Sequence, residues 1–312
     1  MLGHEATTTA AKQLRDQGVS LPGAQALAPT AALGAFIRSF EYHPHLRRAP
    51  GTTIPLMPGP GVTLAISPGE TWEAIDLRSG LRRRWPEAVL TGPSTHRVTE
   101  LFSSGNPSSF VIVFQPGAVY RLFGVPAYRL VNQSLSAEKL LGPSVASLRD
   151  RIRSAHTLAD MRQAAESFFL ERCESAQCAS VVDQAAQLQL QSHGSVPVAE
   201  LIRASGYRRH QFEREFIKRV GLRPKLYARV ARFHHVLRLR AAHPTLSWMV
   251  VSHEAGYFDQ NHLVKEFWQL TGNAPSSMSP VSEDWNPSST LEPNKGVRHF
   301  DIQSVIPGAI FQ

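Results

Sequence analysis

The last third of the chain contains an internal repeat, and this repeat constrains the fold more than any other feature. Gly206-Tyr207 and Gly256-Tyr257 each precede a stretch in which apolar residues, charges and chain breakers recur in the same order. The dipeptides lie at an offset of 50 and the later positions at an offset of 51, so one residue is inserted in the second turn. The later matched positions are Phe212 and Leu263, Arg214 and Lys265, Glu215 and Glu266, Phe216 and Phe267, Gly221 and Gly272, and Pro224 and Pro275. Two copies of one helical unit are therefore predicted.

Each unit has the plan of a helix-turn-helix, because a short amphipathic helix is followed by a glycine turn and by a second helix that ends at glycine. First helices are predicted over 198–205 and 248–255, the latter with Ser247 as its N-cap. In a helix-turn-helix the second helix enters the major groove of DNA. The two units are therefore predicted to read DNA in two grooves.

An α-helix turns by about 100° per residue, and this step separates the two faces of each second helix. Phe212 and Phe216 must face the core in the first unit. Leu263, Phe267 and Leu270 must do so in the second. In the first unit the outward side chains are His210, Arg214 and Ile217, with Glu213 at the edge. In the second unit they are Asn261, Lys265 and Trp268, flanked by His262 and Val264. Arginine suits guanine, asparagine suits adenine and glutamate accepts from cytosine, so these faces are predicted to read base edges.

A further helix is predicted between the units. Apolar residues recur at helical spacing from Leu226 to Leu237, which predicts a helix over 225–242. Its roughly 17 residues would span about 25 Å, less than the ~34 Å between successive major grooves, so either the DNA bends or one unit docks less fully. Four arginines lie on or near this helix: Arg229, Arg232, Arg238 and Arg240. They either contact DNA phosphates or are simply solvated.

The basic charge of the chain is concentrated in the same segment. Of the formal net charge of +8, residues 196–280 carry +7, from 13 Lys/Arg and 6 Asp/Glu. This distribution is the electrostatic footprint of a module that binds a polyanion. A well-solvated basic surface is the alternative that charge by itself leaves open.

Residues 196–280 resemble the C-terminal DNA-binding domain of the AraC/XylS family of bacterial transcriptional regulators. The signature of the second unit stands in LSWMVVSHEAGYFDQNHLVKEFWQLTGNAP. Arg208 departs from the pattern of the first unit, where a capping serine is common, which weakens the start of that helix. By this resemblance the base-contacting residues are His210, Glu213, Arg214, Gln260, Asn261, His262 and Lys265. Gln260 and Asn261 have an alternative role at the helix N-terminus, with Asp259 as the N-cap. Phosphate contacts are assigned to Arg208, Arg209, Arg229 and Arg232.

The first part of the chain has a different texture. Between about 29 and 126, prolines and glycines separate short apolar runs such as FVIVF at 110–114, which is typical of buried strands in a small sandwich or barrel. Segments with helical spacing follow between 144 and 191. Residues 33–42 and 110–130 resemble the β-rich N-terminal domain of one branch of the same family.

The predicted fold class is α+β. A flexible arm is expected over 1–27 and a β-rich regulatory or dimerisation domain with C-terminal helices over 28–192. An all-α DNA-binding domain of two helix-turn-helix units and a linker helix is expected over 193–280, and a tail over 281–312. The segment 193–195 is predicted to be the linker between the two domains.

Other chemistries find little support in the sequence. His43-Pro-His45 is similar to the His-x-His of metal-binding cupins, but the glutamate required about four residues later is absent, so no metal is expected. Two cysteines, Cys173 and Cys178, exclude a disulfide-rich scaffold and an all-cysteine zinc site. No Gly-x-Ser-x-Gly elbow or phosphate-binding glycine loop occurs, so no catalytic residue and no cofactor is assigned. A cytoplasmic location without a membrane partner is expected, because no secretory signal and no stretch of about 20 apolar residues is found.

The sequence therefore predicts a transcription factor whose partner is double-stranded DNA and which is not an enzyme. Its N-terminal domain is expected to sense a small-molecule effector or to form a homodimer, and an activator would also contact RNA polymerase. Two alternatives remain. One is an architectural protein that binds DNA without sequence preference, and the other is a cupin-like metal or enzyme domain with a DNA-targeting module.

Overall fold

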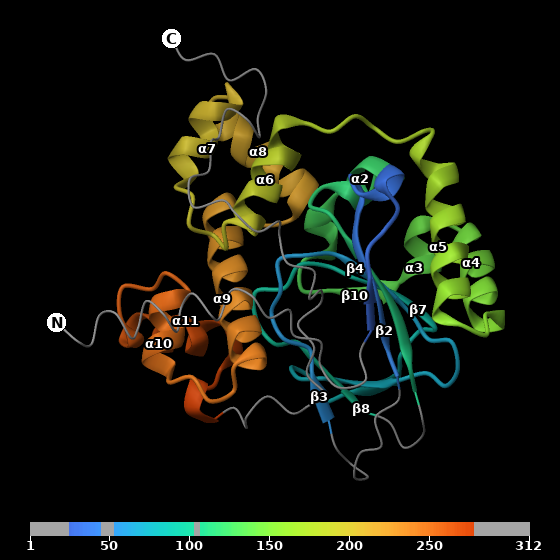
Figure 1. Ribbon diagram of the computed structural model, residues 1–312, viewed down its shortest axis with the longest axis horizontal. Helices are drawn as coiled ribbons and strands as arrows, with labels where there is room; N and C mark the ends of the chain where they lie inside the picture. Colours follow the sequence, from blue (N-terminus) through green and yellow to red (C-terminus); the bar gives the residue numbers. More distant parts are fainter. Residues whose placement is uncertain (1–24, 45–52, 103–106, 278–312) are drawn as a thin grey trace.

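The computed structural model describes residues 25–44, 53–102 and 107–277, and Figure 1 shows a β-rich half beside a helical half. The β-rich half contains a six-stranded antiparallel sheet, in the order β1-β2-β9-β4-β7-β10, and a four-stranded antiparallel sheet, in the order β3-β8-β5-β6. The strands are β1 (Gln25–Leu27), β2 (Ile37–His43), β3 (Thr53–Pro55), β4 (Thr63–Ile66), β5 (Glu73–Asp76), β6 (Arg82–Arg84), β7 (Ala88–Thr91), β8 (Thr99–Phe102), β9 (Ser109–Phe114) and β10 (Ser134–Ser136). The predicted α+β fold class is confirmed.

The centre of the larger sheet consists of branched and aromatic side chains. Phe40 of β2 and Leu64 of β4 both pair with Ile112 of β9, and all three side chains are completely buried. Side chains of this shape pack well on a pleated surface. The apolar run 110–114 therefore forms a central strand, as its composition predicts.

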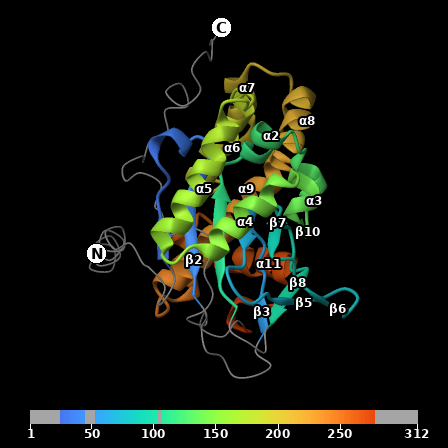
Figure 2. The ribbon, with the colours of Figure 1, turned by 90° about the vertical axis from the view of Figure 1, so that its right-hand side faces the viewer.

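Helices pack on this sheet, and Figure 2 shows α4 and α5 lying across it. The ring of Phe169 in α5 meets that of Phe114 in β9 edge to face, with ring centroids 5.6 Å apart. α5 begins with a capping box, in which the side chains of Thr157 and Asp160 each accept from the other residue's backbone N–H. The elements of this layer are η1 (Ala31–Leu33), α2 (Ala118–Phe123), η2 (Ala127–Leu130), α3 (Ala137–Leu141), α4 (Ser144–Ser154) and α5 (Leu158–Cys173).

The four-stranded sheet packs on the larger one through a smaller cluster. Ala74 of β5, Trp85 and Val89 of β7 are buried together. The indole N–H of Trp72 donates to the Ser109 hydroxyl of β9 at 3.0 Å. The two sheets therefore contact each other near β7 and β9.

The helical half has an apolar core of its own. Phe212, Phe216, Leu263 and Phe267 are completely buried, and Leu270 is 3% exposed. The predicted core faces of both second helices are confirmed, and so is the linker helix, which runs between the two units in Figure 1. The helices are α6 (Val181–Gln191), α7 (Val198–Ser205), α8 (Arg209–Val220), α9 (Pro224–Ala242), α10 (Trp248–Glu254), α11 (Gln260–Thr271) and η3 (Pro275–Ser277).

α6 packs with the helix-turn-helix units, although the sequence analysis placed it with the β-rich domain. Its side chains Val182, Ala185 and Leu188 are completely buried in the helical core. We therefore propose that the DNA-binding domain begins near residue 180, before α6.

The predicted linker 193–195 is a tight turn inside the helical half. His193 and Gly194 have positive φ angles of 54° and 76°. A Cβ atom on Gly194 would lie 2.1 Å from the carbonyl oxygen of Ala228 in α9, so only glycine fits there. The connection between the two halves runs instead from the end of α5 to the start of α6.

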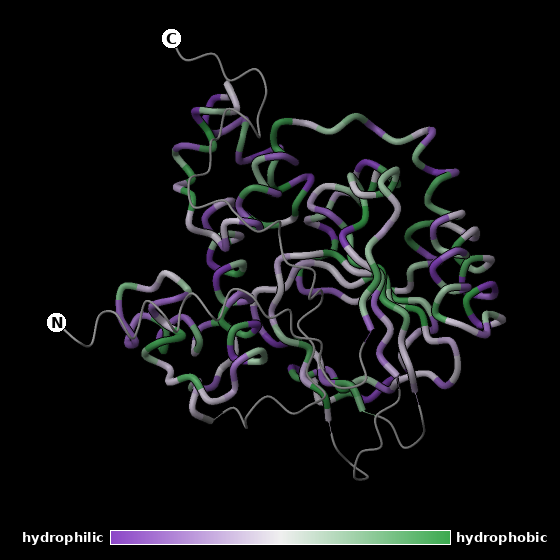
Figure 3. The backbone as a smooth tube through the Cα atoms, in the orientation of Figure 1, coloured by the Kyte–Doolittle hydropathy of each residue, from purple (hydrophilic) through white to green (hydrophobic). Residues whose placement is uncertain are grey.

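Figure 3 shows hydrophobic residues concentrated along the strands at the centre of the β-rich half. On the helices, hydrophilic and hydrophobic residues alternate along the backbone, as expected of helices with one buried face. Within the described ranges, no helix combines the length and the apolar character needed to cross a bilayer.

Candidate DNA-binding interface

The first reading helix, α8, exposes its predicted base-facing side chains. Gly206, with a φ of 69°, makes the left-handed turn that ends α7 and leads toward α8. Arg214 is 72% exposed and His210 is exposed, whereas Glu213 is half-buried. Arg208 occupies the N-cap without a side-chain hydrogen bond, so the start of this helix lacks a capping side chain, as the sequence predicts.

The second reading helix, α11, starts at a true cap. The Asp259 side chain accepts from the backbone N–H of His262 at 2.7 Å, which confirms Asp259 as the N-cap. Gln260, Asn261, His262 and Lys265 are all exposed. The Ser247 hydroxyl caps α10 in the same way, through the backbone N–H of Val250 at 3.3 Å. Both helices of unit two therefore start at a local capping hydrogen bond.

Two exposed arginines of α8, Arg209 and Arg214, are held only loosely by their acidic neighbours. Arg209 lies 3.9 Å from Glu213, and Arg214 lies 3.9 Å from Glu215. Surface pairs of this kind contribute about 0–1 kcal/mol. Both guanidinium groups thus remain available to DNA.

Two predicted phosphate contacts have partners within the protein instead. Arg229 of α9 donates from Nε to Glu266 of α11 at 2.7 Å and also bonds the side chain of Gln269. Glu266 is only 5% exposed, so this ion pair lies in the interface of the two helices.

Arg232 is engaged in the same region. It donates to the carbonyl oxygen of Gly194 at 3.0 Å, and its guanidinium group lies 5.5 Å from the ring centroid of Tyr257. Burial is the main cause that raises the pKa of Tyr257, and the neighbouring Glu266 carboxylate adds to it. We propose that Arg229 and Arg232 orient α11 against α9, while the exposed Arg208 and Arg209 contact phosphates.

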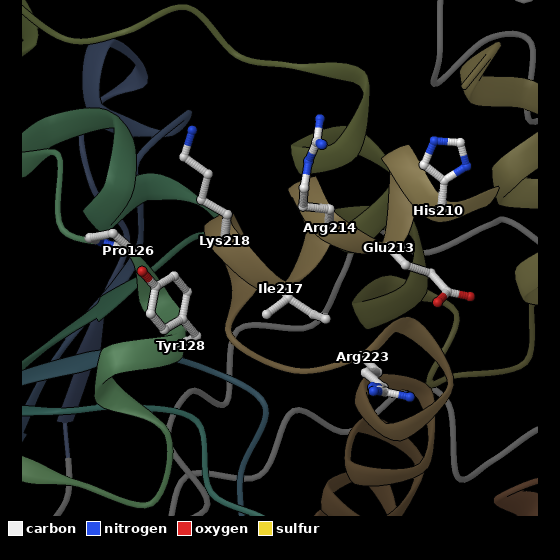
Figure 4. Close-up of a pocket in the computed structure, with 8 residues that line it drawn as sticks. All are labelled: Pro126, Tyr128, His210, Glu213, Arg214, Ile217, Lys218 and Arg223. Carbon is white, nitrogen blue, oxygen red and sulfur yellow. The ribbon is translucent and has the colours of Figure 1, made fainter. Parts of the chain in front are cut away.

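A cleft of about 480 Å³ separates the outward face of α8 from η2 of the β-rich half (Figure 4). Tyr128, which is 53% exposed, stands on the η2 side together with Pro126. The predicted base-facing side chains of α8 therefore line a cleft whose opposite wall belongs to the β-rich half. The residues that line the cleft are Pro126, Tyr128, His210, Glu213, Arg214, Ile217, Lys218 and Arg223.

The last turn of α8 is held against α2 of the β-rich half. The Nζ atom of Lys218 and the guanidinium carbon of Arg219 lie 4.9 Å and 5.0 Å from the ring centroid of Tyr120. A hydrogen bond with the Tyr120 side chain is the main cause that raises the pKa of Lys218. Arg219 also forms an ion pair of 2.8 Å with Asp183 of α6. α2, α6 and α8 thus meet at one charged junction.

Three histidines lie where α9 meets the β-rich half. The rings of His193 and His235 stack with centroids 3.7 Å apart and an interplanar angle of 2°. Burial is the main cause that lowers the pKa of His193 to about 4 and that of His234 to about 3. The positive charges of Arg238 and, toward His234, of Arg38 in β2 act in the same direction. These histidines are therefore neutral at pH 7.

The described residues place no three His, Cys, Asp or Glu side chains together as ligands of a metal ion. Of the predicted His-x-His pair, His45 lies outside the described residues. His43 instead has its Nε2 atom 3.4 Å from the buried carboxylate of Glu41, to which the hydroxyl of Ser39 also donates.

Tyr120, Tyr128 and Asp183 approach α8 from outside its own unit and were not predicted from the sequence. For Asp183 a signal was present, because Ser180 and Asp183 have the spacing of a capping box and form one. No local pattern marks Tyr120 or Tyr128, because their partners on α8 are far away in the sequence.

Comparison with known families assigns two segments of the chain. Residues 201–279 match the family described as a helix-turn-helix domain. The chain carries an AraC-type helix-turn-helix domain. Residues 25–136 match a domain of unknown function, DUF6597, which lies upstream of the AraC-type domain. The chain is therefore a DNA-binding transcription regulator.

Solved structures of ToxT from Vibrio cholerae are similar to the chain. The structure from strain O395 is 11% identical, covers 76% of this chain and 95% of its own, and has a TM-score of 0.44. The 1.65 Å structure is 12% identical, with coverage of 76% and 96% and a TM-score of 0.46. The structure of ToxT bound to an unsaturated fatty acid is 11% identical, with coverage of 76% and 93% and a TM-score of 0.45. A comparison with curated proteins gave no match.

Proposed function

We propose that this regulator binds specific DNA sequences by inserting α8 and α11 into successive major grooves. The observation that carries the proposal is that both helices expose hydrogen-bonding side chains at repeat-related positions, Arg214 and Lys265 among them, above completely buried aromatic rings. Such side chains bond guanine O6 and N7 in the major groove. The exposed Arg208, Arg209 and Arg223 would supply the attraction to phosphates.

Selection of bound sequences from a random DNA pool, with the full-length protein at physiological salt, tests this proposal. We expect a bipartite motif whose two elements lie about one helical turn, ~34 Å, apart. Equal binding of all sequences would instead identify an architectural protein. A stoichiometric transition metal in the purified protein would favour an enzyme or metal domain with a DNA-targeting module.

Replacement of Arg214 or Lys265 by alanine should relax discrimination at a few base pairs within one element of the motif. Each loss should be about 1–3 kcal/mol, because a direct contact with a base edge is removed. Affinities for duplexes with single substitutions, compared between the wild type and each variant, measure this effect. A uniform loss over all sequences would show that the two side chains contact phosphates, and the assignment of the outward faces would be wrong.

We further propose that the β-rich half controls access to α8. The major groove is about 12 Å wide, and a helix with its side chains is about 10–12 Å across, so α8 cannot enter the groove while η2 stays beside it. Pro126 and Tyr128 line the same cleft as the outward side chains of α8, and DNA around α8 would have to occupy this cleft. An effector or a second copy that favours a displaced β-rich half would then favour DNA binding.

Replacement of Tyr120 by alanine should tighten DNA binding by about five- to thirtyfold, because it removes two cation–π contacts of roughly 0.5–1 kcal/mol each that hold α8. Fluorescence anisotropy with the selected duplex measures the change. Phe102→Ala is a matched control, because Phe102 has its own cation–π contact with Arg82, within the four-stranded sheet. Unchanged or weaker binding by the Tyr120 variant would contradict control of α8 by this contact.

A further inference from the structure

The two helix-turn-helix units differ in charge. Residues 196–246, which contain unit one and α9, hold 12 Lys/Arg and 3 Asp/Glu, a net charge of +9. Residues 247–280, which contain unit two, hold one lysine and 3 Asp/Glu, a net charge of −2. Attraction to phosphates grows with the number of Lys and Arg side chains that approach them. Unit two must therefore hold DNA chiefly through another kind of contact.

Unit two instead exposes large apolar side chains beside its reading face. Phe258 is 93% exposed and Trp268 is 56% exposed. Phe258 is the residue inserted in the turn of the second unit, and it directly precedes Asp259, the N-cap of α11. Around the axis of α11, Trp268 lies within about 20° of Asn261. The two rings thus border the predicted base contacts at both ends of the helix.

We propose that unit two binds DNA through apolar contacts of Phe258 and Trp268 with thymine methyl and deoxyribose groups, whereas unit one and α9 supply the attraction to phosphates. Thymine presents its methyl group in the major groove, where apolar side chains read it. The inference rests on the proposed function, namely that both α8 and α11 read base edges.

The placement of the two rings favours DNA over a protein as the partner. Phe258 precedes the N-cap of α11, whereas Trp268 lies eight residues, or about 12 Å, beyond the first residue of the helix. The exposed hydrogen-bonding side chains of Gln260, Asn261 and Lys265 lie between them, so the surface is not the continuous apolar patch that a protein interface presents. The N-terminal residues of a second helix are also those that meet base edges, and Phe258 stands beside them.

The experiment uses the full-length protein with the duplex obtained by selection, at several salt concentrations from roughly 50 to 200 mM. Phe258→Ser and Trp268→Ala should each weaken DNA binding about tenfold. The slope of log Kd against log salt concentration should stay the same as in the wild type, because apolar contacts release no counterions. Deoxyuridine in place of thymine in the unit-two element should weaken the wild type severalfold and the two variants less. Met249→Ala is the matched control, because Met249 is 67% exposed but lies on α10, and it should bind as the wild type does. Arg209→Ala should instead reduce the salt slope by about one.

The inference would be overturned if both variants bound DNA with wild-type affinity or if their salt slope were reduced. It would also be overturned if deoxyuridine weakened the wild type and the variants equally. A change in self-association on sedimentation would assign the rings to contact with a second copy, and would overturn it as well. Wild-type binding by the Phe258 and Trp268 variants together with weaker binding by Arg209→Ala would remove this inference alone. Equal binding of all duplexes by the wild type would remove the proposed function itself.

Discussion

Replacement of Asp183 by alanine should lower the free energy of unfolding by about 3–5 kcal/mol, the usual effect of removing one partner from a buried ion pair. Asp183 is 5% exposed, and its partner Arg219 is 14% exposed. Without the carboxylate, the largely buried guanidinium group of Arg219 would keep only the more distant carboxylate of Glu215, 3.8 Å away, as an ion-pair partner. The same carboxylate accepts from the backbone N–H of Ser180 at 2.9 Å, so the substitution also removes part of the cap of α6. Burial raises the pKa of Asp183 even beside Arg219, as expected of a carboxyl group with little access to water.

Urea denaturation of the full-length protein, followed by circular dichroism, measures this loss. Asp160→Ala is a matched control, because Asp160 forms the same capping box with Thr157 at the start of α5 but is exposed. The difference between the two variants measures what the buried carboxylate contributes beyond the cap, chiefly through the ion pair with Arg219. If both variants unfold at the same urea concentration, the pair contributes nothing beyond the cap.

The position of Asp183 gives this substitution a second consequence. A Cβ atom on Gly117, the N-cap of α2, would lie 2.0 Å from Oδ1 of Asp183, so α2 rests directly on this carboxylate. Asp183 therefore joins α6 to α8 through Arg219 and to the β-rich half through α2. Its loss should free α8 while it destabilises the fold, so stability and DNA affinity should change in opposite directions.

The helix-turn-helix units could be predicted from the sequence because each is specified by short-range features. Phe212 and Phe216 stand one helical turn apart, and Ser247 and Asp259 bond backbone groups within three residues. The place of α6 could not be predicted, because its apolar positions suit either core. Only the tertiary structure shows that Val182 belongs with the helical half.

The candidate site likewise has features that the sequence predicts and contacts that only the tertiary structure shows. Helical periodicity is enough to show that Arg214 and Lys265 point outward. Periodicity could not show that Arg229 bonds Glu266, because that carboxylate lies 37 residues later in the chain and is oriented by the packing of α11 on α9. Outward position thus predicts accessibility, whereas the partner of a long, charged side chain depends on contacts that are distant in sequence.

Acidification from pH 7 to pH 5 should destabilise the folded chain by about 2 kcal/mol for each of His193 and His234. In the folded chain their pKa values are about 4 and about 3, whereas both groups titrate near 6.5 in the unfolded chain. Below pH 6.5 the unfolded chain therefore binds more protons, and stability falls as the pH decreases from 6.5 toward 4. At pH 5 the unfolded groups are 1.5 units below their pKa, and each unit is worth about 1.36 kcal/mol.

The pKa of His235 is lowered for the same reason, so its titration acts in the same direction. Urea midpoints at pH 7 and pH 5 measure the loss, and the double variant His193→Asn with His234→Gln should lose much less than the wild type. Asparagine tolerates the positive φ of 54° at position 193, and His253→Gln, an exposed site, is the control. Because Arg38 of β2 and Arg238 of α9 both face His234, a proton there would meet two positive charges from opposite sides of the junction. Equal wild-type midpoints at the two pH values would mean that the folded cluster accepts protons without opening, which is incompatible with the lowered pKa values.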